Sequence, residues 1–355
     1  MSDRELAPDF LTPTWLGDVL GHQIVDFGVR RIGDGLVGMN LRLAIDYADP
    51  EAAAAADAPS TVVAKLPSPD PTSRATGVAL RNYEREVKFY RDLADTLDIC
   101  VARCHHASWD EASGDFVLVL EDLAPGEQGN QLTGCTVEQA RTAVIELARL
   151  HGPRWDDPTL HDIEWLGRRT GPDDAQMLAG MWSMLLPGFM ATYATYLTTE
   201  AQDLVTGFTA RIRDWVEGRD GAWTVTHGDY RLDNLMFASA AGGYPLATVD
   251  WQSPGHGQST GDVSYFMGAG LVPEQRRDVE RDMVSGYGEA LSGYGVDLDE
   301  AWLWRHYCRD AYGGVIMSVI ASQIVATTER SEALFATMAT RHTQHALDLN
   351  AASLL

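Results

Sequence analysis

The sequence predicts an α+β protein with two lobes, a small β-rich N-terminal lobe and a larger, mainly helical C-terminal lobe. Apolar residues alternate with polar ones through much of the first 123 residues, whereas later they recur at helical spacing. The chain has 355 residues, of which 45% are apolar and 22% charged, as in globular proteins with a sizeable core. We therefore expect an N-terminal lobe over residues 1–123 and a C-terminal lobe over residues 124–355.

The N-terminal lobe is predicted to hold a five-stranded, mainly antiparallel sheet and one helix. Short apolar runs broken by turn residues indicate strands at Leu41–Tyr47, Thr61–Leu66 and Phe116–Glu121. The Ala-rich segment Glu51–Pro59 has low complexity, and we interpret it as a long hairpin loop. Residues 80–97 carry apolar side chains at helical spacing, which predicts the helix.

Helices dominate the predicted C-terminal lobe. Thr136 and Gln139 form the capping-box pattern that opens a helix. Further helical patterns run through residues 175–217, 259–294, 298–326 and 330–350, and short apolar runs interrupt them at residues 223–226, 235–238 and 247–249. This order predicts a helical lobe that carries small hairpins.

The chain is strongly acidic, with 27 Lys and Arg against 51 Asp and Glu and a net charge of −24. Such a charge repels phosphate backbones and anionic lipids, which argues against nucleic-acid or membrane partners and favours a small molecule, with a slight bias toward a cation. Two of the four cysteines form one C-x₃-C pair, and the other two are scattered without metal-ligand spacing. The N-terminus lacks the basic start and the apolar run of a signal peptide. We expect a cytoplasmic protein with reduced thiols and without a membrane span.

The most specific motif runs from His227 through Gly-Asp-Tyr-Arg-Leu-Asp to Asn234. Enzymes that transfer phosphoryl groups need a carboxylate to orient the attacking hydroxyl and oxygen ligands to hold metal ions on the phosphates. Asp229 and Asn234 have the spacing of the base and the metal-binding Asn in the catalytic loop of protein kinases. Asp250 follows a short β-run, where a second metal ligand is expected. Taken singly, His-Gly-Asp is more often an ordinary turn, so only the combination indicates phosphoryl transfer.

Lys65 ends the strand Thr-Val-Val-Ala-Lys, which is the pattern of a strand whose lysine binds the α- and β-phosphates. A solvated lysine at a strand end is the ordinary alternative. Only two of the 27 basic residues are lysines, which weakens that alternative, because arginine could replace a lysine that only carries charge. On a helical wheel Glu86 falls at the edge of the apolar face of residues 80–97. We therefore expect Glu86 to pair with Lys65, with Glu84 as the second choice.

Two further segments are candidates for nucleotide binding. The glycines of Gly33-Asp-Gly35-Leu-Val-Gly38 would fold over phosphates through backbone N–H groups, although a hairpin turn explains them equally well. Glu121-Asp122-Leu123 ends the last strand predicted for the N-terminal lobe, where a connector would offer backbone groups to adenine.

With these motifs, the sequence resembles the aminoglycoside phosphotransferase and choline kinase family of small-molecule kinases, and especially its ecdysteroid-kinase-like branch. The resemblance spans residues 24–270 and is carried by VVAKLP, YEREVKFY, LVLEDL, LARLHGPRW, HGDYRLDNLMF, VDWQ and GDVSYFM. It implies a protein-kinase-like bilobal fold, ATP and Mg²⁺. By position, Asp229 would be the catalytic base, with Asn234 and Asp250 as metal ligands. Lys65 and Glu86 would position the phosphates.

The same resemblance gives roles to two residues near the loop. Asp262, in GDVSYFM, would brace the catalytic loop from the start of a helix. Arg231 stands two residues after the proposed base. It would neutralise charge on the transferred phosphoryl group, although a surface salt bridge is an equal alternative.

The leading hypothesis is an ATP-dependent transfer of the γ-phosphoryl group to a hydroxyl of a small molecule. A nucleotide-binding, pseudokinase-like module without transfer is the alternative, and the intact set of motif residues speaks against it. A metal-dependent hydrolase would need more ligands than His227 and Asp229 supply. Phosphorylation of a protein is not expected, because no A-P-E segment follows Asp250.

Overall fold

The computed structural model describes residues 6–33, 38–219, 221, 223–325 and 327–355. The chain packs as two compact units. The N-terminal unit consists of Met1–Asp95, Val101–Ala124 and Asp250–Gln252, and the C-terminal unit of Thr96–Cys100, Pro125–Val249 and Ser253–Leu355. The short segment that begins at Asp250 therefore packs with strands that lie far before it in the sequence.

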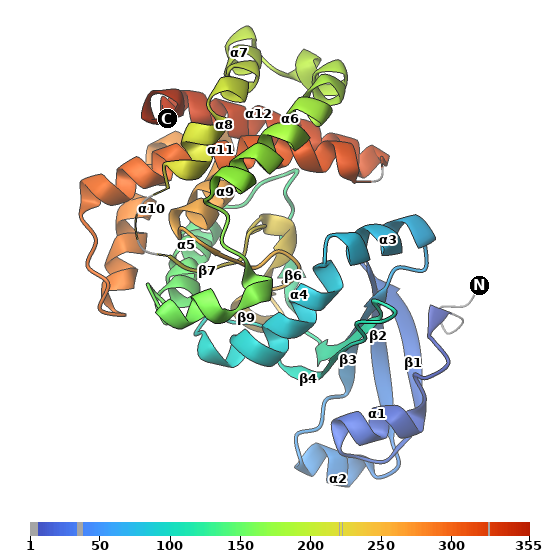
Figure 1. Ribbon diagram of the computed structural model, residues 1–355. Coiled ribbons are helices and arrows are strands. Elements are labelled where there is room, and N and C mark those ends of the chain that lie inside the picture. Colours follow the sequence, from blue (N-terminus) through green and yellow to red (C-terminus); the bar gives the residue numbers. More distant parts are fainter. Residues whose placement is uncertain (1–5, 34–37, 220, 222, 326) are drawn as a thin grey trace. The chain divides into compact units, whose positions relative to one another are not determined.

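The described part of the N-terminal unit contains a five-stranded antiparallel sheet with the strand order β1-β2-β3-β5-β4 (Figure 1). The strands are β1 (Ile24–Ile32), β2 (Gly38–Tyr47), β3 (Thr61–Pro67), β4 (Cys104–Trp109) and β5 (Phe116–Glu121). In the central strand β3, Val62, Ala64 and Leu66 join the apolar core of this unit. Because side chains alternate along a strand, Lys65 projects from the opposite face of the sheet.

The N-terminal unit contains more helices than the single helix predicted from the sequence, and one of the additional helices lies in the Ala-rich segment. The helices are α1 (Pro13–Leu20), α2 (Pro50–Ala55), α3 (Pro71–Ala79) and α4 (Asn82–Lys88). The sequence predicted a loop where α2 forms. Asp49 caps this helix by accepting the N–H of Ala52 at 2.9 Å, Pro50 stands in its first turn, and alanine has the highest helix propensity.

The helical pattern over residues 80–97 is only partly continuous in the structure. After α4 the chain continues through a wider π turn at Phe89–Leu93 and a 3₁₀ turn at Ala94–Thr96. Tyr83 and Val87 are buried as predicted, but Leu80 is 44% exposed, because it caps the end of α3 instead of joining α4.

The C-terminal unit is helical, as predicted, with small β-elements between its helices. Its helices are α5 (Val137–His151), α6 (Pro172–Tyr193), α7 (Thr199–Gly207), α8 (Ile212–Glu217), α9 (Thr260–Gly270), α10 (Pro273–Ser292), α11 (Glu300–Ile324) and α12 (Glu329–Asp348). Its strands are β6 (Glu127–Gln128), β7 (Thr224–Thr226), β8 (Leu235–Ser239), β9 (Gly242–Thr248) and β10 (Gly255–Gly257). The capping box predicted for α5 forms, with Thr136 and Gln139 each bonding the backbone of the other.

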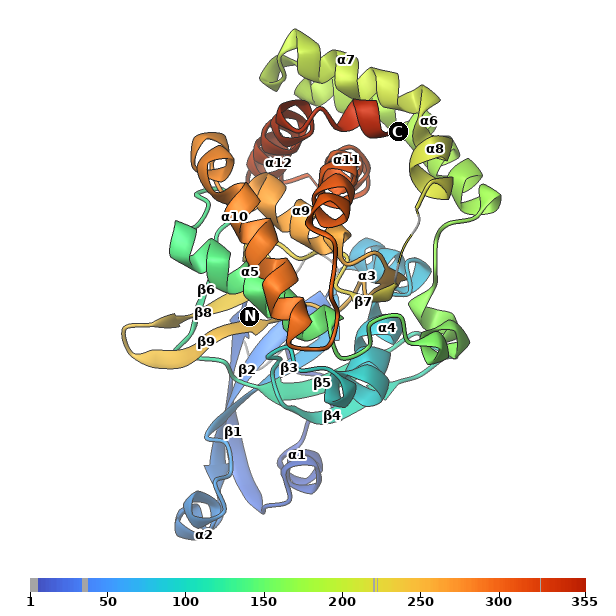
Figure 2. The ribbon, with the colours of Figure 1, turned by 90° about the vertical axis from the view of Figure 1, so that its left-hand side faces the viewer.

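The core of the C-terminal unit lies around α11, which packs against α9 and α12 (Figure 2). Within this core the ring of Tyr312 stacks on Phe208, with the centroids 4.4 Å apart. Two glycines let α12 approach closely. A Cβ at Gly268 would lie 2.5 Å from Nδ1 of His342, and a Cβ at Gly314 would overlap the same ring. His342 is therefore wedged between α9 and α11, and this slot exists only because both positions are glycine.

None of the helices in the described ranges is long and apolar enough to cross a membrane.

Candidate active site

Asp229 lies in a loop that begins directly after β7. Gly228 has a φ of +78°, which glycine adopts without strain, and a Cβ there would collide with the carbonyl oxygen of Ser253. At the start of α9, the buried carboxylate of Asp262 accepts the backbone N–H groups of His227 at 2.7 Å and Gly228 at 2.9 Å. The helix start thus holds the loop, in the way that the resemblance implied.

His151 supports Asp262 from α5. The ring is fully buried, and its Nε2 lies 3.3 Å from the Asp262 carboxylate while Nδ1 lies 2.8 Å from the Tyr287 hydroxyl. Burial alone would raise the pKa of Asp262, but the hydrogen bond and charge of His151 and the N–H of His227 lower it below its usual value. Asp262 is therefore ionised at neutral pH and can keep accepting both N–H groups of the loop.

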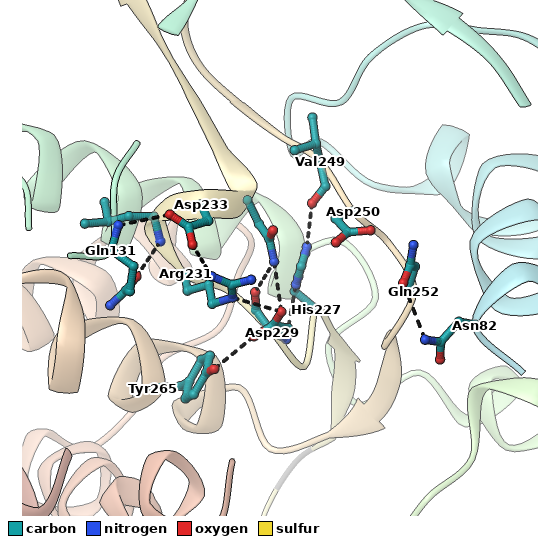
Figure 3. Close-up of polar contacts among 12 residues, drawn as sticks. Asn82, Gln131, His227, Asp229, Arg231, Asp233, Val249, Asp250, Gln252 and Tyr265 are labelled. Atoms are coloured by element: carbon teal, nitrogen blue, oxygen red, sulfur yellow. Dashed lines mark hydrogen bonds and ion pairs between the residues drawn. The ribbon is translucent and has the colours of Figure 1, made fainter. Parts of the chain in front are cut away.

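The carboxylate of Asp229 accepts three side-chain hydrogen bonds (Figure 3). Oδ1 accepts the hydroxyl of Tyr265 at 2.9 Å. Oδ2 accepts Nε of Arg231 at 3.2 Å and Nδ2 of Asn234 at 3.0 Å. The structure therefore brings together three of the residues singled out in the sequence, Asp229, Arg231 and Asn234, and adds Tyr265.

Arg231 is a partly buried ion-pair residue, with 16% of its side chain exposed. Its guanidinium bonds Asp229 and, through Nη1 at 2.5 Å, Asp233. Burial lowers the pKa of Arg231, but the carboxylates of Asp229 and Asp233 raise it more, so the net shift is upward. Arg231 is thus a fixed positive charge directly beside Asp229.

The ring of His227 connects the loop to the end of β9. Its Nδ1 accepts the backbone N–H of Asp229 at 3.2 Å, and its Nε2 then donates to the carbonyl of Val249 at 3.1 Å. The N–H of Val249 donates in turn to the carbonyl of Asn234 at 2.9 Å. These bonds hold the residue that precedes Asp250 against the loop.

A second polar cluster lies inside the N-terminal unit and contains Lys65, Glu86 and Asp250. Nζ of Lys65 lies 2.5 Å from Oε1 of Glu86 and 3.0 Å from Oδ1 of Asp250. Glu86 is fully buried and Lys65 is 8% exposed. Burial lowers the pKa of Lys65, but the two carboxylates raise it above its usual value. Lys65 is therefore a buried, charged ammonium, and the structure pairs it with Glu86 from α4.

Asp250 has a φ of 66°, in the left-handed region that Asp adopts more readily than most residues. The residues after it are anchored in the N-terminal unit. The ring of Trp251 stacks on Phe89, with centroids 3.8 Å apart and planes 4° from parallel, and Nε2 of Gln252 donates to Glu86 at 3.4 Å. Strained residues that the surrounding structure holds firmly in place are typical of functional sites.

Glu84, the second choice for the partner of Lys65, is engaged elsewhere. It bonds Arg81 at 2.7 Å and Lys88 at 2.6 Å, and these contacts lower its pKa to about 2. Both cations lie on α4 or at its start, so Glu84, which is itself buried, belongs to a local ion-pair cluster of this helix.

The remaining candidates for nucleotide binding are the glycine segment and the residues Glu121 and Leu123. Gly33 has a φ of +67°, whereas Gly35 lies outside the described residues. The backbone N–H of Glu121 donates to the carbonyl of Arg103 at 2.8 Å, so this donor is already used within the sheet. Leu123 is half-buried just after β5.

Asn234 and Asp250 offer the oxygen ligands that Mg²⁺ prefers. The amide nitrogen of Asn234 donates to the backbone carbonyl of Asp229 at 2.8 Å and to its carboxylate, which leaves the amide oxygen for a cation. Asp250 contributes a carboxylate that is 36% exposed. No group of three or more His, Cys, Asp or Glu side chains arranged to hold a metal occurs in the described part of the chain. The donor types fit Mg²⁺, which commonly takes one or two protein oxygens together with phosphates.

Two polar residues at the loop had no role assigned from the sequence. Gln131 donates its backbone N–H to Asp233 at 3.0 Å and accepts the N–H of Leu232 at 3.0 Å, and nothing in its local sequence marks it. Tyr265 carries a usable signal, because it lies three residues after Asp262 in GDVSYFM. That spacing places both side chains on one face of a helix.

Comparison with known proteins finds a match to the profile of the ecdysteroid kinase-like family over residues 175–298. None of the curated proteins matches the chain. Among solved structures, a choline kinase from Cryptosporidium parvum Iowa II aligns with a TM-score of 0.58 and 10% identity, covering 93% of this chain and 91% of its own. A candidate aminoglycoside phosphotransferase from Ralstonia eutropha JMP134 aligns with a TM-score of 0.54 and 17% identity, covering 95% and 97%. A Plasmodium vivax ethanolamine kinase aligns with a TM-score of 0.56 and 9% identity, covering 96% and 85%.

These likenesses confirm the predicted fold class, an α+β protein-kinase-like fold with an antiparallel sheet in the N-terminal unit and a helical C-terminal unit. The family match and the solved structures all fall in the group of small-molecule kinases with this fold. The family match includes the loop with Asp229, and also Asp250 and Asp262.

Proposed function

We propose that this protein is an ATP-dependent phosphotransferase that moves the γ-phosphoryl group of ATP to a hydroxyl of a small molecule. The observation that carries the proposal is the geometry at Asp229, a carboxylate held by Asn234 and Arg231 in the loop spacing of a kinase. The likeness to small-molecule kinases supports the same reaction class.

In this reaction Asp229 acts as the general base. Its carboxylate orients the acceptor hydroxyl and takes the proton as the acceptor oxygen forms a bond to the γ-phosphorus. The bond between that phosphorus and the oxygen bridging to the β-phosphate breaks, and ADP leaves with the electron pair. Arg231, fixed beside Asp229, would neutralise charge that develops on the transferred group.

The cluster around Lys65 would hold the phosphates of ATP. A compact ammonium that is kept charged and oriented by Glu86 is suited to the α- and β-phosphates. We assign backbone contacts with phosphate to the glycine segment that includes Gly33 and Gly35, and contacts with adenine to the connector at Glu121 and Leu123.

Asn234 and Asp250 would hold Mg²⁺ through the amide oxygen and the carboxylate. Held there, Mg²⁺ would supply positive charge that offsets the negative charge of the phosphates. The protein is expected to act in the cytoplasm, where ATP is abundant, and its four cysteines are free thiols.

The test is to incubate the purified protein with ATP, Mg²⁺ and a mixture of metabolites and aminoglycosides, and to search by mass spectrometry for a molecule that gains one phosphoryl group. A matched reaction without Mg²⁺ is the control. Phosphorylation of an aminoglycoside would indicate a role in resistance, and phosphorylation of a neutral alcohol a metabolic role. ATP binding without transfer to any acceptor or to water would favour the pseudokinase alternative, and efficient phosphorylation of a protein alone would overturn the proposal.

A further inference from the structure

The hydrogen bonds of Asp229 distinguish its two carboxylate oxygens. An ionised carboxylate offers about two acceptor positions on each oxygen. Oδ2 accepts two donors, Arg231 and Asn234, so both positions are used. Oδ1 accepts only the hydroxyl of Tyr265 among the residues that the structure describes. The second position of Oδ1 is therefore where Asp229 can accept the hydroxyl of an acceptor molecule.

The ring of Tyr265 is held rigidly. It stacks on His342 with centroids 5.2 Å apart and planes 8° from parallel. His342 is itself 1% exposed and sits in the slot made by Gly268 and Gly314. The phenol is thus supported by three helices, α9, α11 and α12, and its hydroxyl has little freedom to leave Oδ1.

The protonation states of Tyr265 and His342 allow the Tyr265 hydroxyl to act as a hydrogen-bond donor at all times at neutral pH. Burial, and then the charge of Asp229, raise the pKa of Tyr265 well above its usual value, so the hydroxyl keeps its proton at neutral pH. Burial and the neighbouring His345 hold the pKa of His342 well below its usual value. The His342 ring that stacks on Tyr265 is therefore neutral, so it carries no positive charge that would attract the carboxylate of Asp229.

We propose that Tyr265 is a positioning residue for phosphoryl transfer, whose hydroxyl fixes Asp229 so that Oδ1 is the oxygen that accepts the proton of the acceptor. This inference rests on the proposed function and adds to it the identity of the basic oxygen. Without the Tyr265 hydroxyl, Oδ1 loses its fixed donor, and only the two donors to Oδ2 then restrain rotation of the carboxylate about its Cβ–Cγ bond. A misplacement of about 1 Å in such a site costs on the order of 100-fold in rate.

The first test is Tyr265→Phe, which removes only the hydroxyl. We expect the kcat for transfer to fall roughly 10- to 100-fold, with the affinity for ATP and the melting temperature unchanged. Tyr312→Phe is the matched control, because Tyr312 lies in the same apolar core, is 2% exposed and stacks on Phe208 away from Asp229. Its kcat should equal that of the wild type. Hydrolysis of ATP, in which water takes the phosphoryl group and inorganic phosphate is released, provides a second readout that needs no acceptor molecule.

A double-mutant cycle with Asp229→Ala then separates positioning from general structural support. If Tyr265 acts through Asp229, Tyr265→Phe should not lower the residual rate of Asp229→Ala any further. An equal fold loss in both backgrounds would overturn the inference, and so would an unchanged kcat in Tyr265→Phe alone. A wild type that transfers phosphate neither to an acceptor nor to water would instead overturn the proposed function itself, and this inference with it.

Discussion

Substitutions in the ion pair of Lys65 and Glu86 should affect the stability of the protein and its phosphoryl-transfer activity differently. Replacing Lys65 with Met removes the ammonium that lies 2.5 Å from Glu86 and leaves a fully buried carboxylate without its counter-ion. Breaking a buried pair in this way costs about 3–5 kcal/mol. At about 1.3 °C per kcal/mol for a chain of this length, the melting temperature should fall by about 4–7 °C. Asp250 contributes less to this loss, because its side chain is 36% exposed and can be hydrated.

Replacing both members of the pair, as Lys65→Met with Glu86→Met, removes the uncompensated charge. Apolar replacement of a buried ion pair is often neutral or stabilising, so the double variant should recover most of the melting temperature lost in Lys65→Met. It should not recover function, because neither methionine can bind phosphate. The assays are thermal melting, ATP binding by calorimetry and phosphoryl transfer. A double variant that is no more stable than Lys65→Met would refute the energetic reasoning, and one that transfers phosphate at the wild-type rate would refute the role of Lys65.

Three further predictions concern the metal, the glycine slot and pH. Asp250→Ala should abolish the Mg²⁺ dependence of ATP binding measured by titration, and wild-type turnover in this variant would place the metal elsewhere. Gly314→Ala should lower the melting temperature by an amount equivalent to about 1–3 kcal/mol, because the new methyl overlaps His342. In Gly313→Ala, in the same helix, the new methyl meets nothing within 4 Å, and the protein should instead gain up to about 1 kcal/mol of stability from helix propensity. Equal changes in melting temperature for the two variants would contradict the tight fit of His342 against Gly314. Because burial lowers the pKa of His342 in the folded state, the unfolded chain binds the proton more readily, and stability should fall as pH drops below about 6.5. Denaturant midpoints at pH 7 and pH 5 measure this loss of stability. The loss should be smaller in His342→Gln, and identical midpoints of the wild type at the two pH values would contradict the prediction.

The sequence predicted those parts of the site that depend on local spacing. Asp229 and Asn234 belong to one loop, and their hydrogen bond at 3.0 Å joins residues five apart. The helical wheel placed Glu86 at the edge of the apolar face of its helix, because burial of one face depends on period alone, and the structure buries Glu86 fully. The contact of Lys65 with Asp250 joins residues 185 positions apart, and the sequence did not predict it, because no local pattern relates the two.

What the sequence did not predict depends on tertiary packing or on short-range capping. Tyr265 reaches Asp229 only because His342 and two glycines hold its ring, and these residues come from three different helices. The helix α2 was mistaken for a loop because low complexity outweighed the Asp-Pro start that caps it. Leu80 was misplaced because the apolar period continues across the break between α3 and α4, where Arg81 adopts a left-handed backbone conformation.

The central claim is that Asp229 is the base of a phosphoryl transfer. Its most direct test is to compare the wild type with Asp229→Asn for ATP·Mg²⁺ affinity and for the rate of phosphoryl transfer in the same preparation. The structure predicts unchanged affinity, because the described residues that bond the Asp229 carboxylate are Tyr265, Arg231 and Asn234, none of which is in the Lys65 cluster. The rate should fall by a factor of about 10² to 10⁴. Wild-type turnover in Asp229→Asn would contradict the assignment of the base.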